Sequence, residues 1–366
     1  MFLFVYCAYF TAPVLFLTAG FLQTFGFLQH SHETMFSVKN LLKYYAWRLF
    51  KFVPLLGMVL IFALFMVPFL GAGPIWSTYQ TVMAPCKTYW WTVLLQVNNI
   101  YPRQSFDDKC MPWTWFIPAL TQLSLLLPIL VAVYQACLPN KILLRVLYSI
   151  VMLACCAFCG GITYFYNEGP MPVSIYAVDT VSGAVNNLTV LKFDFYNDVF
   201  MLSPFHLGSY LGGFGLAIVY RRFLLESELN KKVGSEEQTQ ISRSSRYFTL
   251  LSENARIRYG TYLFGCILMF GACSWCYPFM ANAEAQANWH SALFSTAAPI
   301  VFLLGFSTLL MPALVGKAAL FNSVMSCGMF LIVSNLAATM CMVGPITCLW
   351  YYLSSGHTLD ISWYVA

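Results

Sequence analysis

Charged residues are scarce in this chain of 366 residues. Only 9% are Asp, Glu, Lys or Arg, while 60% are hydrophobic, and an ordinary soluble domain carries about 25% charged residues. This composition excludes a soluble globular protein. Polar residues are also rare inside the long apolar segments, where we find mostly Gln122, Asn322 and Asn335. A transporter or channel, whose pathway needs polar or charged side chains, is therefore the least favoured functional class.

Three further patterns are missing. Segments such as 61–66 are apolar on every side and lack the alternation of a β-barrel strand. No pair of the 13 cysteines has a zinc-binding spacing with neighbouring His. No basic patch is interleaved with stacking aromatic residues, so the net charge of +5 does not indicate a nucleic-acid partner. We expect no metal and no nucleic acid to be bound.

What the chain does contain is a series of apolar runs, each long enough to cross roughly 30 Å of hydrocarbon as a helix. We expect an all-α, polytopic bundle of transmembrane helices. Eight spans are predicted: Val5 to Leu28, Phe50 to Leu70, Trp113 to Ala136, Leu143 to Phe165, Pro204 to Leu224, Tyr262 to Phe279, Ala292 to Leu314 and Ala319 to Tyr351. The last run is too long for one untilted span, and Gly344-Pro345 could split off a ninth.

Basic residues fix the predicted orientation. All but four of the 19 Lys and Arg residues lie in or beside the odd-numbered connections, 29–49, 137–142, 225–261 and 315–318. By the positive-inside rule this side is cytosolic, or matrix in a mitochondrion, and both termini lie opposite. One membrane domain is expected over 1–353, with a non-cytosolic loop at 71–112, a cytosolic loop at 225–258 and a tail at 354–366. The first span lacks a basic flank and a cleavage pattern, so we expect it to be retained.

The non-cytosolic side carries two candidate modification sites. Cys86 and Cys110 lie in one loop and could close it as a disulfide in an oxidising compartment, with two reduced structural cysteines as the alternative. Asn187-Leu188-Thr189 is a glycosylation sequon. The other cysteines lie mostly in spans, including Cys155, Cys156 and Cys159, where small side chains suit close helix packing.

Two segments have a distinctive order of residues. The segment 86–99 reads Cys-Lys-Thr-Tyr-Trp-Trp-Thr-Val-Leu-Leu-Gln-Val-Asn-Asn, and 110–116 reads Cys-Met-Pro-Trp-Thr-Trp-Phe. This order resembles that of the acyltransferase-3 family, most closely its nose-resistant-to-fluoxetine branch. Arg48, Lys51 and Pro54 resemble the family's Arg-x-x-Arg-x-x-Pro. Further similar segments are 16–22, 206–213 and 336–345, so the resemblance covers nearly the whole chain.

The resemblance implies transfer of an acyl group from a donor such as acyl-coenzyme A to a hydroxyl of a sugar or lipid. That chemistry needs a base, typically His, and a cationic site for the donor's phosphates. We expect Arg48 and Lys51 to lie on one side of the second span and to bind a donor phosphate or an anionic lipid head. The resemblance also pairs Cys86 with Cys110 as a disulfide.

The chain departs from the family where protons are handled. The family's first helix, which carries the base, has no counterpart here, although another chain could supply it. Four ionisable family positions align with Pro13 (Asp), Leu120 (an acidic residue), His206 (Arg) and Gly344 (His), and a family Ser aligns with Ala19. Buried ionisable groups are costly in hydrocarbon and persist where function needs them.

Substitute bases were considered at His30, His32 and His206. A His at a helix end is more often an interfacial hydrogen-bonding residue. We therefore expect a catalytically inactive membrane protein that acts as a structural or accessory subunit, or as a lipid-binding scaffold. An active membrane O-acyltransferase, with acyl-coenzyme A as donor, is the alternative.

The expected partners are membrane lipids and other membrane subunits, and no cofactor is expected. An endomembrane or plasma membrane is the family default, and an inner mitochondrial membrane fits the charge pattern equally well.

Overall fold

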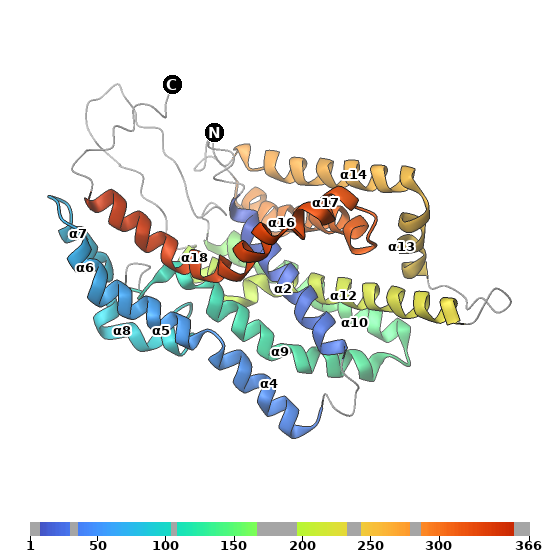
Figure 1. Cartoon of the computed structure of the whole chain (residues 1–366). Helices are drawn as coiled ribbons and strands as arrows, with labels where there is room; N and C mark the ends of the chain where they lie inside the picture. The colour runs from blue at the N-terminus through green and yellow to red at the C-terminus, as the bar shows by residue number, and fades with distance from the viewer. Residues whose placement is uncertain are drawn as a thin grey trace. The chain divides into compact units, whose positions relative to one another are not determined.

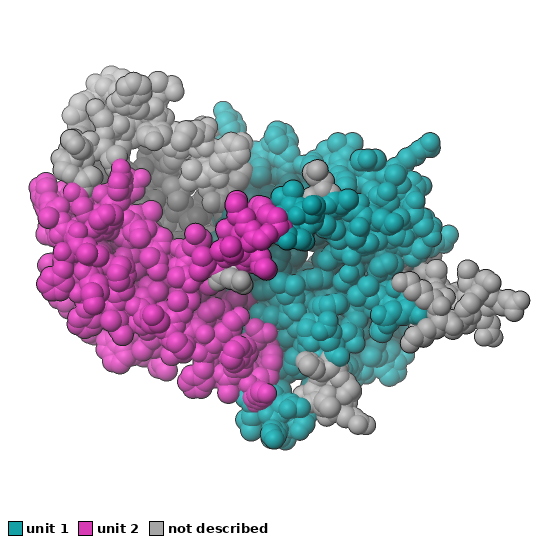
Figure 2. Space-filling model, viewed as in Figure 1, with its two compact units in different colours: residues 1–42, 122–326 teal, residues 43–121, 327–366 magenta. Residues whose placement is uncertain are grey.

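The computed structural model describes residues 8–29, 36–103, 108–166, 196–232, 243–278 and 287–354, and within these ranges every regular element is a helix. The expected all-α class is confirmed. The chain divides into two compact units, coloured separately in Figure 2. Unit 1 contains residues 1–42 and 122–326, and unit 2 contains residues 43–121 and 327–366.

Six helical segments in the described ranges are long and apolar enough to cross a membrane. They are Thr11–Leu28, Val38–Leu70, Pro112–Cys137, Lys141–Phe165, Asn288–Leu314 and Leu336–Ser354. The two other segments expected to span also form helices, α12 (Ser203–Lys232) and α14 (Ala255–Ser274), but they are less apolar. Charged residues such as Arg222 and Arg258 lie within these two helices, so the count of eight spans stays a prediction.

In Figure 1, unit 1 contains the dark blue helix α2 and the helices coloured from green through orange. Besides α12 and α14, its elements are η1 (Ala8–Phe10), α2 (Thr11–Leu28), α10 (Lys141–Tyr166), η4 (Tyr196–Phe200), α13 (Arg243–Glu253), α16 (Asn288–Leu314) and α17 (Ala319–Met325), with the later part of α9 (Phe116–Cys137).

Small residues allow the helices of unit 1 to approach closely. A Cβ atom on Gly213 of α12 would overlap the carbonyl of Leu17 in α2, and a Cβ on Gly20 would overlap the carbonyl of Tyr210. Gly265 and Gly305 play the same part between α14 and α16, where an added Cβ would lie 2.8 to 2.9 Å from the opposite carbonyl oxygen. These contacts follow the small-residue rule for helices in membranes.

Unit 2 is built on a long, interrupted helix. α4 (Val38–Phe50, whose first turns belong to unit 1) leads into α5 (Val53–Ile61), the π-helical turn η2 (Phe62–Met66) and α6 (Val67–Leu70). α7 (Ser77–Met83), α8 (Pro85–Leu94), the short η3 (Pro112–Thr114), the start of α9 and α18 (Gly328–Ser354) complete the unit. Its core contains Leu56, Tyr79, Met111 and Met342.

Proline explains the π-helical turn. The Val67 N–H donates to the carbonyl of Phe62, five residues back, so the Ala63 carbonyl would need the N–H of Pro68, which proline lacks. The hydroxyl of Tyr79 donates to this carbonyl instead, at 2.7 Å. A side chain from α7 therefore completes the hydrogen bonding of the long helix.

Candidate functional site: an apolar cavity in unit 1

A cavity of about 350 Å³ lies among α2, α10, α12 and α16 of unit 1. Small-molecule sites in proteins are typically about 300 to 1,000 Å³. No Asp, Glu, Lys or Arg occurs among the described residues that line it. Leu304, which is 55% exposed, belongs to the wall, so the wall includes a side chain at the surface of the unit.

Three of the hydroxyl groups in the wall donate to helix backbones. Tyr148 of α10 donates to the Leu211 carbonyl at 3.0 Å. Ser295 and Thr296 of α16 both donate to the Ala292 carbonyl, at 3.1 and 2.9 Å. Ser209 and Ser307 also line the cavity, so a ligand meets mainly hydrocarbon and sulfur together with a few hydroxyl groups.

His206 lies in this wall, near the start of α12, and is 1% exposed. Its ring stacks on Phe16 with centroids 4.4 Å apart, and its Nε2 lies 2.7 Å from the Phe200 carbonyl oxygen. A carbonyl oxygen can only accept, so Nε2 carries a proton and donates it to this bond. Nε2 is therefore not placed to act as a general base.

Pro13 lines the same cavity, from the first turn of α2. The two positions that the resemblance aligns with a family Asp and a family Arg, Pro13 and His206, are thus brought together by the fold. The other aligned positions, Leu120 in α9 and Gly344 in α18, belong to unit 2. A Cβ on Gly344 would meet no atom within 4 Å.

Three cysteines of α10 were missed as cavity residues. Cys155, Cys156 and Cys159 all line the cavity, and the thiol of Cys159 donates to the Phe205 carbonyl at 3.5 Å. Sequence reasoning placed them only in helix packing. Their spacing puts Cys155 and Cys159 on one helix face, but nothing in the sequence shows which neighbour that face meets.

Arg48 and Lys51 lie where α4 ends and α5 begins, in unit 2. The guanidinium carbon of Arg48 is 5.2 Å from the centroid of the Tyr44 ring, and Nζ of Lys51 is 5.0 Å from that of Phe52. Lys51 is exposed, and the buried Nε of Arg48 has no hydrogen-bond partner within the described ranges. Binding of a phosphate or lipid head by this pair stays a prediction.

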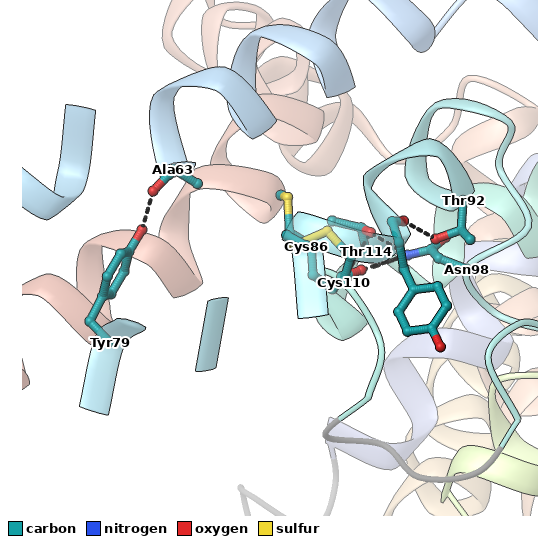
Figure 3. The surroundings of a disulfide bond; sticks show 9 residues. Ala63, Tyr79, Cys86, Thr92, Asn98, Cys110 and Thr114 are labelled. Atoms are coloured by element: carbon teal, nitrogen blue, oxygen red, sulfur yellow. Dashed lines mark hydrogen bonds between the residues drawn. A yellow bond between two sulfur atoms is a disulfide. The ribbon is translucent and has the colours of Figure 1, made fainter. Parts of the chain in front are cut away.

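Cys86 and Cys110 are joined by a disulfide, with their Cα atoms 4.4 Å apart (Figure 3). The chain returning to α9 is also held by Asn98, whose amide donates to Thr114 Oγ1 at 2.9 Å. Lys109, which is 1% exposed, donates to the Asn99 carbonyl at 3.1 Å. The disulfide and these two hydrogen bonds therefore hold the loop together.

The remaining candidates of the sequence, His30, His32 and Asn187, lie outside the described residues. Within the described ranges, no group of three or more His, Cys, Asp or Glu residues could hold a metal ion.

The chain is similar to nose resistant to fluoxetine protein 6 of Caenorhabditis elegans, with 24% identity over 204 residues. The match covers 54% of this chain and 22% of the relative, so this chain spans less than a quarter of that protein. No protein-family model matches, and no solved structure matches either. Together with the apolar helices, the similarity supports an integral membrane protein distantly similar to that relative.

Proposed function

We propose that this chain is an acyltransferase-3-like membrane protein that does not transfer acyl groups and instead binds a lipid acyl chain in the unit 1 cavity. In this role it serves as a scaffold or accessory subunit of a membrane assembly. The observation that carries the proposal is the cavity wall, which has no Asp, Glu, Lys or Arg among its described residues and has Pro13 and His206 at the two aligned positions.

The cavity's chemistry supports binding over turnover. Acyl transfer to a hydroxyl needs a base within hydrogen-bond reach of that hydroxyl. The His206 Nε2 atom donates to a backbone carbonyl, and no carboxylate is found among the described lining residues.

An acyl chain suits such a wall because each buried methylene contributes about 0.8 kcal/mol. Leu304 of the wall is exposed on α16, a helix apolar enough to span the membrane, so we expect lipid to reach the cavity from the bilayer. A polar substrate would have to leave water for a wall that offers it no charged partner among the described residues. Lipid is therefore the ligand class that we propose.

The disulfide helps to decide between the candidate membranes. Disulfides persist on the oxidising side of secretory-pathway and cell-surface membranes, and Cys86 and Cys110 belong to the loop predicted to be non-cytosolic. This favours an endomembrane or plasma membrane for the protein over an inner mitochondrial membrane.

A fluorescent fatty acid tests the binding site. Cys156→Phe places a ring in the cavity, whereas Leu153→Phe, on the same helix, adds a ring at a position that is 68% exposed. We expect the parent protein and Leu153→Phe to bind the probe, and Cys156→Phe to lose binding. Equal binding by both variants, with both folded, would exclude this cavity as the site.

An activity assay tests the absence of transfer. Purified protein with labelled acyl-coenzyme A and sugar or lipid hydroxyl acceptors should give no transfer above a heat-inactivated control. Turnover that is abolished by changing His206, His30 or His32 would contradict the proposal and identify the substitute base.

A further inference from the structure

The segment 76–96 of unit 2 belongs to the stretch predicted as a non-cytosolic loop, yet it lies along the long spanning helix. Four contacts pair the two in antiparallel order: Trp76 with Pro68, Tyr79 with Ala63, Leu94 with Gly57 and Gln96 with Leu49. Figure 1 shows α7 and α8 beside α5 and α6. As residue numbers rise along 76–96, those of its partners fall.

These contacts lie along a helical segment that can cross a bilayer. The partners run from Leu49, near the end of α4, to Pro68 in α6. All of them lie within Val38–Leu70, which is long and apolar enough to cross the hydrocarbon core. Its outward side chains are exposed hydrocarbon, with Phe69 at 87% and Met58 at 70%. A segment lying along this helix meets the same surroundings.

At the tip of the segment, polar groups form hydrogen bonds with other parts of unit 2 and within the segment. Gln96 is 3% exposed; its Nε2 donates to the Leu49 carbonyl at 2.6 Å, and its Oε1 accepts from Thr121 at 2.5 Å. The Val97 N–H donates to the Thr92 carbonyl at 2.9 Å. Irregular backbone at membrane depth is tolerated only where protein satisfies its polar groups. The hydrogen bonds of Gln96 and Val97 satisfy this condition at the tip.

The two faces of the segment differ in exposure. Cys86, Thr92 and Val93 are buried on the inner face. The outer face carries large apolar and aromatic side chains that are 38 to 64% exposed: Trp90, Trp91, Leu95, Ile100 and Tyr101. The rings of Trp91 and Tyr101 lie 5.7 Å apart. Trp and Tyr of this kind gather where a membrane surface meets water.

We infer that residues 76–101 form a re-entrant membrane segment, which enters the bilayer beside α5 and turns back at residues 96–100. Its outer face is a phospholipid-contact surface. The tip is bonded to Leu49 and to Thr121, which belongs to the spanning segment Pro112–Cys137. The outer side chains Leu95 and Ile100 then lie against the acyl chains.

Photolabelling of the intact protein in nanodiscs tests this assignment without a variant. Phosphatidylcholine with a diazirine on its acyl chain should label the peptide covering 88–103, and a water-soluble diazirine should not. Labelling by the aqueous reagent alone would show a solvated loop and overturn the inference. Labelling by neither would overturn it too, since the face would then be covered by protein.

A matched pair of variants adds a second measurement. Leu95→Arg places a charge on the outer face, whereas Lys87→Arg keeps the charge of an exposed residue in the same helix. We expect Leu95→Arg to lose the acyl-chain label on its peptide, and Lys87→Arg to retain it. If the Leu95→Arg protein does not fold, the parent's labelling still decides the question.

Discussion

The hydroxyl of Tyr79 is predicted to stabilise unit 2 through a single hydrogen bond. The Ala63 carbonyl has lost its helical partner, because the Val67 N–H donates to Phe62 and Pro68 has no N–H. Tyr79 donates to it at 2.7 Å and is 1% exposed. Tyr79→Phe removes this donor and leaves a buried acceptor unpaired.

The magnitude follows from that geometry. The ring of Tyr79 stacks on Trp76 with centroids 4.9 Å apart, and phenylalanine preserves both the stack and nearly all the volume. The cost is therefore that of an unpaired buried acceptor, about 1 to 3 kcal/mol. It should appear as a lower free energy of unfolding for Tyr79→Phe, measured in detergent or nanodiscs by denaturant titration.

Two controls make the test specific. Tyr101→Phe removes a hydroxyl from a side chain that is 47% exposed and should change stability little. Pro68→Ala restores an N–H that can reach the Ala63 carbonyl, so the cost of Tyr79→Phe should shrink in that background. An unchanged cost beside Pro68→Ala, or equal losses from Tyr79→Phe and Tyr101→Phe, would refute the reasoning.

Two further predictions concern packing and the disulfide. Gly213→Ala should destabilise the protein by about 1 to 3 kcal/mol, since its Cβ meets backbone; Gly161→Ala, whose Cβ meets nothing within 4 Å, is the control in the same denaturant assay. Cys110→Ser should lower stability by about 2 to 4 kcal/mol and abolish the mass shift on reduction, whereas Cys266→Ser, at an exposed free thiol, should change neither.

The helices themselves could be predicted because length and apolarity are local properties. Runs such as 143–165 are apolar enough to be recognised without any knowledge of their neighbours. The same rule fails for residues 76–96, where polar residues interrupt the apolar ones and the chain forms two short helices, α7 and α8, with a kink at Tyr89 inside α8. The re-entrant reading depends instead on contacts such as Gln96 with Leu49, 47 residues apart, which no local pattern reveals.

The cavity was beyond reach of the sequence for a similar reason. Its wall combines Pro13, Cys155, His206 and Ser295 from four different helices. Periodicity shows which residues share one face of one helix, but it does not show which faces meet. For His206 the sequence suggested an interfacial hydrogen bond; the structure gives it a buried bond to the Phe200 carbonyl. The disulfide was easier, because the family resemblance pairs Cys86 with Cys110, whereas their place in one loop left two reduced cysteines as an alternative.

The physical demands on unit 1 are unequal. Gly20 and Gly213 cannot gain even a methyl group without overlapping the backbone of the facing helix, so the approach of α2 to α12 depends on them. The packing of the bundle does not require a charged side chain at position 13 or 206. An ionised group in hydrocarbon costs several kcal/mol unless it is paired, so neutral side chains at these two positions favour the stability of the bundle. In the proposed family resemblance, these are positions where acyl transfer would need charge. If the cavity only holds an apolar chain, as we propose, replacing a charged side chain by a neutral one stabilises the bundle and removes no group that binding requires.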